Sequence, residues 1–163
     1  MHVFRIAILV LSILFGACTI FAQSGSGQVD FITILKSTES QMEDSRDQVI
    51  SSTAAWVRFW EELYPDAETR PSLPEVDFTQ RMVIVVAMGE EPTGNFDIKV
   101  TKLVRVKGVS KGLPLLKVLI EETRPKPSCF PLPSTTQPIH VIETDRVFDV
   151  TFRRILKTDR CGG

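Results

Sequence analysis

A run of seven apolar residues, Met82–Met88, constrains the fold of this chain more than any other segment. It is rich in β-branched side chains, and an unbroken apolar run this short is typical of a strand buried on both faces. Pro92 and Gly94 follow closely and predict a tight reversal, because Pro restricts φ and Gly accepts positive φ. An alternating strand then begins at Phe96. The segment therefore predicts the core of a β-rich domain with a shaped loop at its edge.

The strand that begins at Phe96 carries apolar residues at even positions as far as Val106. This alternation predicts one buried face and one face in water. Lys102 and Leu103 exchange the pattern, and such an exchange indicates a β-bulge.

A helix is predicted from Thr53 to Tyr64, with Ser51 or Ser52 as its N-cap and Pro65 as its stop. Its large apolar residues share one face at spacings of three and four: Trp56, Phe59, Trp60 and Leu63. A tryptophan stripe could form a partner or carbohydrate surface. Helical spacing favours packing on a sheet instead, because each ring buries a large area.

The remaining apolar segments predict further strands, and two of them, Ile139–Ile142 and Val147–Leu156, are predicted to pair as a hairpin. Other strands are expected over Val29–Leu35, Val49–Ile50 and Leu115–Thr123. The expected fold class is α+β and β-rich: a mostly antiparallel sheet or sandwich of about seven strands with one main helix, about 53–64. Residues 29–163 are expected to form a single domain.

The amino terminus resembles a secretory signal peptide, residues 1–22, because an apolar stretch precedes the small residue Ala22. The alternative is cleavage before Cys18 and lipidation of its thiol, which would anchor the chain to the outer face of a membrane. Residues 23–28 contain alternating Ser and Gly and are expected to form a flexible linker. The expected location is secreted or periplasmic, with no membrane span.

Removal of residues 1–22 would leave 141 residues with 18 basic and 20 acidic side chains, a net charge of −2. A near-neutral chain without a basic block argues against nucleic acid as a partner. Two cysteines, Cys129 and Cys161, would remain. An even pair in an oxidising compartment predicts a disulfide, which stabilises by about 3–4 kcal/mol in the chain-entropy model. Two separate thiols are the alternative.

An ordered set of short motifs resembles the protease complex subunit PrcB family. The set comprises Trp56 with Phe59-Trp60, Val76-Asp77-Phe78, Met82–Val86, Gly89-Glu90, Pro92-Thr93-Gly94, Ser40-Gln41, Pro127, Cys129 and Thr136-Gln137-Pro138. The resemblance implies a secreted or lipid-anchored accessory domain that associates with a surface protease. Relatives carry Gly-Gly-Tyr where this chain has Gly94-Asn95-Phe96, and Asn tolerates a left-handed backbone.

Catalytic chemistry is poorly represented in the sequence. His140 would be the one histidine after signal removal, and it is expected to face solvent or a loop rather than to ligate a metal. A Cys129–His140 thiolate pair is conceivable, but the disulfide is the simpler use of that sulfur. Glu90-Glu91 and Glu121-Glu122 are interpreted as solvated strand edges. We therefore expect no enzyme activity, no metal and no cofactor.

Two functional hypotheses follow. The first is a non-catalytic binding module that docks on or stabilises a protein partner, possible partners including an extracytoplasmic protease. The second is a protease inhibitor similar to the chagasin family, which would use the Pro92–Phe96 loop as a wedge. Rigid loops lose little entropy on binding, so the predicted contact residues lie in two of them: Glu91, Pro92, Thr93, Gly94, Asn95 and Phe96 in one, and Thr135, Thr136, Gln137 and Pro138 in the other.

Overall fold

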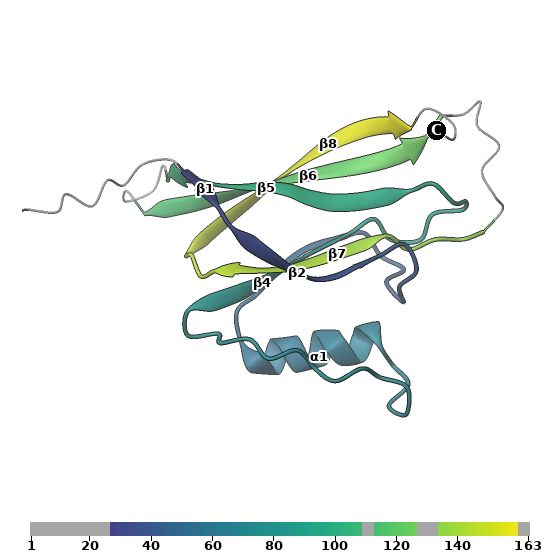
Figure 1. Cartoon of the computed structure of the whole chain (residues 1–163), viewed down its shortest axis with the longest axis horizontal. Helices are drawn as coiled ribbons and strands as arrows, with labels where there is room; N and C mark the ends of the chain where they lie inside the picture. The colour runs from purple at the N-terminus through teal and green to yellow at the C-terminus, as the bar shows by residue number, and fades with distance from the viewer. Residues whose placement is uncertain (1–26, 109–112, 127–133, 160–163) are drawn as a thin grey trace, which may run out of the picture.

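The computed structural model describes residues 27–108, 113–126 and 134–159. These residues form three layers, with two stacked sheets and one helix against the outer face of one sheet (Figure 1). The described residues form eight strands and a single helix, which confirms the predicted β-rich α+β class.

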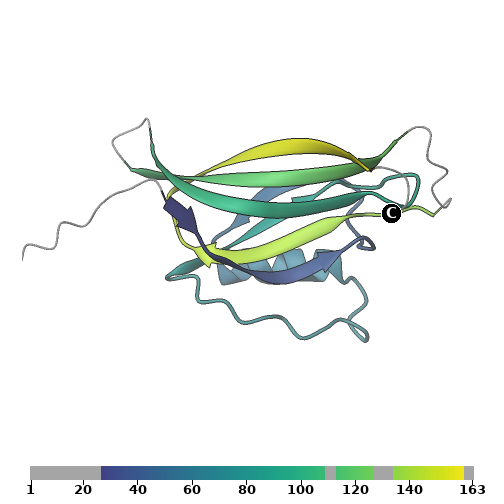
Figure 2. The same cartoon turned by 45° about the horizontal axis from the view of Figure 1, so that its top comes forward.

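One four-stranded sheet, here called sheet A, has the order β1-β5-β6-β8. Its members are β1 (Gly27–Val29), β5 (Asp97–Lys107), β6 (Pro114–Pro125) and β8 (Asp149–Asp159). The second, sheet B, has the order β2-β7-β4-β3. Its members are β2 (Phe31–Ser37), β7 (Ile139–Asp145), β4 (Arg81–Ala87) and β3 (Arg46–Ile50). All pairings are antiparallel except that of β6 with β8, which is parallel. Figure 2 shows the two sheets stacked, with the helix below sheet B.

β4 is buried on both faces, as its unbroken apolar run predicts. Met82, Ile84 and Val86 face the core between the sheets. Val83 and Val85 face the other way, into the core beneath the helix. A sheet in the middle layer has no face in contact with solvent, so the side chains on both faces of this strand must be apolar.

The helix α1 (Thr53–Leu63) carries its aromatic residues toward sheet B, which confirms the prediction that they pack on a sheet. Ser52 is its N-cap, and the Ser52 hydroxyl accepts a hydrogen bond from the backbone N–H of Ala55. Trp56 and Trp60 are 1% and 5% exposed. Each indole N–H donates at 2.9 Å to a carbonyl of the segment that follows the helix, at Pro74 and Pro71 respectively.

The predicted bulge in β5 is confirmed between Val100 and Lys102. Its effect is larger than the alternation suggests, because one extra residue reverses the facing of every later side chain. Leu103 joins the core between the sheets and is fully buried. Val104 and Val106, which the pattern places beside Ile98, are therefore on the opposite face.

The expected strand Val29–Leu35 and the end of the expected linker both differ from the structure. The segment Val29–Leu35 is not one strand, since the chain passes from sheet A to sheet B at Asp30, whose carbonyl accepts a hydrogen bond from the Thr144 hydroxyl. Gly27 and Gln28, assigned to the linker, are the first residues of β1.

The predicted hairpin between Ile139–Ile142 and Val147–Leu156 does not form. β7 lies in sheet B, whereas β8 crosses to sheet A and pairs in parallel with β6. Arg146 holds the crossing, because its guanidinium donates to the Phe78 carbonyl and its backbone N–H to the Gln80 carbonyl.

Candidate functional site

The two predicted contact loops meet at one end of the sandwich. The backbone N–H of Glu91 donates to the Thr136 carbonyl at 2.8 Å, and the N–H of Thr136 donates back to the Glu91 carbonyl at 2.9 Å. The Thr136 hydroxyl donates at 3.0 Å to the carbonyl of Thr93. These bonds join residues 91–96 and residues 134–138 into one surface, here called the loop platform.

The ten predicted contact residues differ in accessibility. Pro92, Asn95 and Thr135 are exposed, and Glu91, Thr93, Gly94 and Gln137 are half-buried. Thr136 and Pro138 are buried, and their backbone hydrogen bonds hold the loops in place, so they expose little surface. Phe96 packs against the core between the sheets and is not a free wedge.

Left-handed backbone occurs at both ends of the first loop. Asn95 has φ of 67°, the conformation that its side chain was expected to tolerate. Gly89 has φ of 84°, whereas Gly94, the residue expected to use this freedom, does not have positive φ. A Cβ on Gly89 would lie 2.7 Å from the carbonyl oxygen of Glu43, so the close approach also requires glycine.

A third segment, residues 38–45, supports the platform from below. The Thr38 carbonyl accepts from the backbone N–H of Gln137, and the Ser40 hydroxyl donates to the Gln137 carbonyl at 2.8 Å. The Glu43 carbonyl accepts from the N–H of Glu90. Sequence reasoning did not assign this segment to the site, and its Ser40-Gln41 motif was the one signal available.

Charged side chains lie just inside the platform. Glu122 is 6% exposed and accepts hydrogen bonds from Arg154 and, at 3.3 Å, from Arg124. Its interpretation as a solvated edge is wrong, although its neighbour Glu121 does point to the opposite, outer face, where it binds Lys99 and Lys157. Burial raises the pKa of Glu91. This carboxyl therefore gains a proton more readily than an exposed glutamate would.

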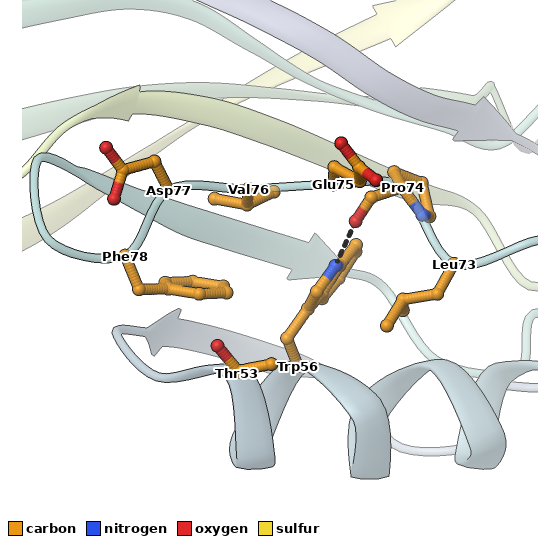
Figure 3. A pocket seen from close by; sticks show the side chains of 8 residues that line it. All are labelled: Thr53, Trp56, Leu73, Pro74, Glu75, Val76, Asp77 and Phe78. Carbon is orange, nitrogen blue, oxygen red and sulfur yellow. Dashed lines mark hydrogen bonds between the residues drawn. The ribbon is translucent and has the colours of Figure 1, made fainter.

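Two hollows flank different parts of the molecule. One of about 370 Å³ adjoins the platform and is lined by Lys36–Glu39 and Asp97, with Lys36 and Asp97 paired at 2.9 Å. The other, of about 600 Å³, lies away from the platform between α1 and residues 73–78 (Figure 3). Its base contains Trp56 and Phe78, and both are almost entirely buried. The second hollow is therefore a shallow apolar depression over the helix packing.

His140 contradicts its predicted placement in solvent or a loop. It is 4% exposed and lies between the sheets. The imidazole Nδ1 accepts from the backbone N–H of Val100 at 2.9 Å, and Nε2 lies 3.0 Å from the Thr33 hydroxyl. Burial, together with Lys36, lowers its pKa to about 4. This histidine therefore joins the sheets as a neutral ring.

Several sequence predictions concern residues outside the described ranges. The signal peptide 1–22, the lipidation candidate Cys18, and the disulfide candidates Cys129 and Cys161 all lie there. They stay predictions. Within the described ranges, no helix has the length and apolar character needed to cross a membrane. Across those same residues, His, Cys, Asp and Glu side chains form no group of three or more suited to a metal ion.

Strand β4, which is buried on both faces, and the two paired loops come from one continuous stretch of the sequence. Residues 82–145 match the PrcB C-terminal family model. The match confirms the resemblance inferred from the sequence, and it contains both loops of the platform together with β4–β7. Comparison with curated proteins and with solved structures gave no match.

Proposed function

We propose that this chain is a non-catalytic, protease-associated binding module that contacts its protein partner through the loop platform. The observation that carries the proposal is the mutual hydrogen bonding of Glu91 and Thr136, which makes two separate loops one stiff surface. A surface ordered before binding loses less conformational entropy when a partner docks.

The location of the platform supports the same proposal. Its exposed residues, Pro92, Asn95 and Thr135, lie within the PrcB C-terminal match. The name of that family refers to a subunit of a protease complex, so a protease is the proposed partner class. Pro92 and Asn95 also expose apolar and amide groups beside the half-buried carboxylate of Glu91, a mixture typical of protein interfaces.

We further propose that the module acts outside the cytoplasm after removal of residues 1–22. The apolar amino-terminal segment and the even cysteine pair, Cys129 and Cys161, support this location. A free secreted form is proposed ahead of an anchored form with lipid on Cys18.

Site-specific photo-crosslinking tests the contact surface. A benzoylphenylalanine residue would replace Asn95 in the full chain expressed in its native cell, and crosslinked products would be identified by mass spectrometry. The matched control places the same group at Ala54, which is exposed on α1 away from the platform. We expect a crosslink to a protease from position 95 and none from position 54.

Two further variants check the interpretation. Asn95→Arg with Thr135→Arg should reduce co-purification of the crosslinked protease at least about tenfold, because two charged side chains would be forced into the interface. Ala54→Arg should leave co-purification unchanged. Equal crosslinking from both positions, or products without any protease, would refute the proposal.

A further inference from the structure

Among the residues that the structure describes, β8 has a strand neighbour on one side only. It is the last strand in the order of sheet A, and its eleven residues pair with β6 alone. Within the described residues, the backbone of β8 makes no hydrogen bond outside that ladder. Figure 1 shows this strand along the upper margin of the sheet. An edge of this length presents a row of free N–H and C=O groups for another strand.

Exposed apolar side chains lie at both ends of this edge. Phe148, immediately before β8, is 88% exposed, and Leu156 near its end is 62% exposed. Residues of even number in β8 point toward the inter-sheet core, where Val150 and Phe152 pack. Phe148 and Leu156 lie on the same face of the strand, but beyond the part of it that packs against the other sheet. The edge thus carries two apolar groups that one monomer leaves uncovered.

We propose that β8 pairs antiparallel with β8 of a second copy, to give a symmetric dimer with a continuous eight-stranded sheet. With Phe152 on the two-fold axis, Phe148 of one copy lies opposite Leu156 of the other. The two-fold rotation then brings Phe148 and Leu156 of different copies together at two places, so the exposed apolar side chains of both copies are covered. A symmetric interface requires a patch that complements itself, and the order of residues along β8 meets this requirement.

The charged residues on the outer face of β8 are compatible with this register. Asp149 would lie diagonally between Arg153 and Lys157 of the second copy, within reach of these long side chains. A shift of the axis to Arg153 would place Asp149 directly opposite Lys157, but it would also place two guanidinium groups opposite each other and Phe148 opposite Thr158. The pairing of Phe148 with Leu156 therefore selects the axis at Phe152.

A second copy explains these features better than a foreign strand does. A foreign peptide could use the free backbone groups, but it would not explain why the exposed Phe148 and Leu156 lie equally far from Phe152 on the same face. The cationic residues Arg153 and Lys157 normally discourage edge pairing. In the antiparallel dimer they lie near Asp149 of the second copy, whose carboxylate offsets the repulsion between the cationic side chains.

Sedimentation equilibrium of the full mature chain, over a wide concentration range, tests the dimer. We expect the mass to rise from one chain to two. Phe148→Asp with Leu156→Asp should yield a monomer, and both sites are exposed enough for the fold to survive, which circular dichroism checks. Ile32→Asp is the matched control, since Ile32 is 60% exposed on β2, in the other sheet, and should leave the dimer intact.

A charge exchange tests the register. Asp149→Arg should weaken dimerisation about tenfold, because each lost contact occurs twice in a symmetric interface. Adding Arg153→Asp should restore most of that loss. Hydrogen exchange should show the β8 amides that point away from β6 protected at dimer concentration and exposed on dilution. A single-chain mass at every concentration, or a dimer that survives Phe148→Asp with Leu156→Asp, would overturn the proposal.

The dimer is independent of the proposed function. Its interface lies on β8, whereas the proposed protease contact lies on the loop platform. Loss of crosslinking at position 95 would leave the sedimentation result unaffected, and the converse also holds.

Discussion

His140 in β7 accepts a hydrogen bond from the backbone N–H of Val100 in β5, so one ring nitrogen joins the two sheets directly. Val100 adjoins the bulge, and β1 pairs with β5 only at Leu103–Arg105. Within the described part of the chain, no strand therefore neighbours Val100 on that side. Because a backbone N–H can only donate, Nδ1 must be unprotonated, and the ring proton lies on Nε2 and points to the Thr33 hydroxyl.

The first prediction concerns pH. The pKa of His140 is about 4 in the folded chain and about 6.5 in an unfolded one. Between these values only the unfolded chain binds the proton, so the free energy of unfolding should fall as pH decreases from 6.5 to 4. The contribution of this residue should reach about 2–3 kcal/mol. Urea unfolding across this pH range measures it.

Two variants separate the effect of imidazole protonation from the effect of losing the hydrogen bond to Val100. His140→Asn places a side-chain oxygen near the position of Nδ1, so it should keep the bond to Val100 and lose the pH dependence. His140→Leu should lose about 1–3 kcal/mol at neutral pH, because it leaves a buried N–H without an acceptor. Subtracting the stability curve of each variant from that of the wild type cancels the contribution of the carboxylates, which all three proteins share. A His140→Asn curve parallel to that of the wild type would contradict the assignment.

The second prediction concerns Arg154, which bonds Glu122 of its own sheet and Asp47 of the other. Arg154→Ala should destabilise by about 2–4 kcal/mol, because Glu122 is buried and would keep only Arg124. Arg58→Ala, at an exposed position on α1, should change the free energy of unfolding by less than about 0.5 kcal/mol.

The third prediction concerns two left-handed residues, Asn95 in the loop platform and Gly89 shortly before it. Asn95→Ala should destabilise by about 1 kcal/mol, because alanine tolerates positive φ poorly, and Asn95→Gly should have little effect. Gly89→Ala should cost more than Asn95→Ala, since its Cβ would meet backbone atoms of Glu43 and Ser45 at 2.7 Å. Thermal unfolding ranks the three. Equal costs for Asn95→Ala and Asn95→Gly would show that φ is not the cause.

The fourth prediction concerns processing. Intact mass of the mature chain should correspond to a first residue of Gln23, and reductant should add the mass of two hydrogen atoms as a Cys129–Cys161 disulfide opens. A mass that begins at Cys18 and includes a lipid would support the anchored form instead. A mass unchanged by reductant would exclude the disulfide.

Local pattern alone determined the strongest elements of this protein. The apolar run Met82–Met88 identified the strand of the middle layer, and the spacing of Trp56 and Trp60 identified the packed helix. The exchange at Lys102 and Leu103 identified the bulge. Each of these signals depends on neighbours within a few residues, so periodicity is sufficient to read it.

Tertiary structure alone decided which strands became neighbours and where polar groups were buried. β7 and β8 are adjacent in sequence and lie in different sheets, and no local pattern encodes that crossing. The sequence predicted that His140 faces solvent. Its role as a hydrogen-bond acceptor could not be read from its neighbours, because the donor, Val100, lies forty positions away along the chain. Long-range pairing is selected by the packing of whole layers, and that selection is what joined Glu91 to Thr136 in the loop platform.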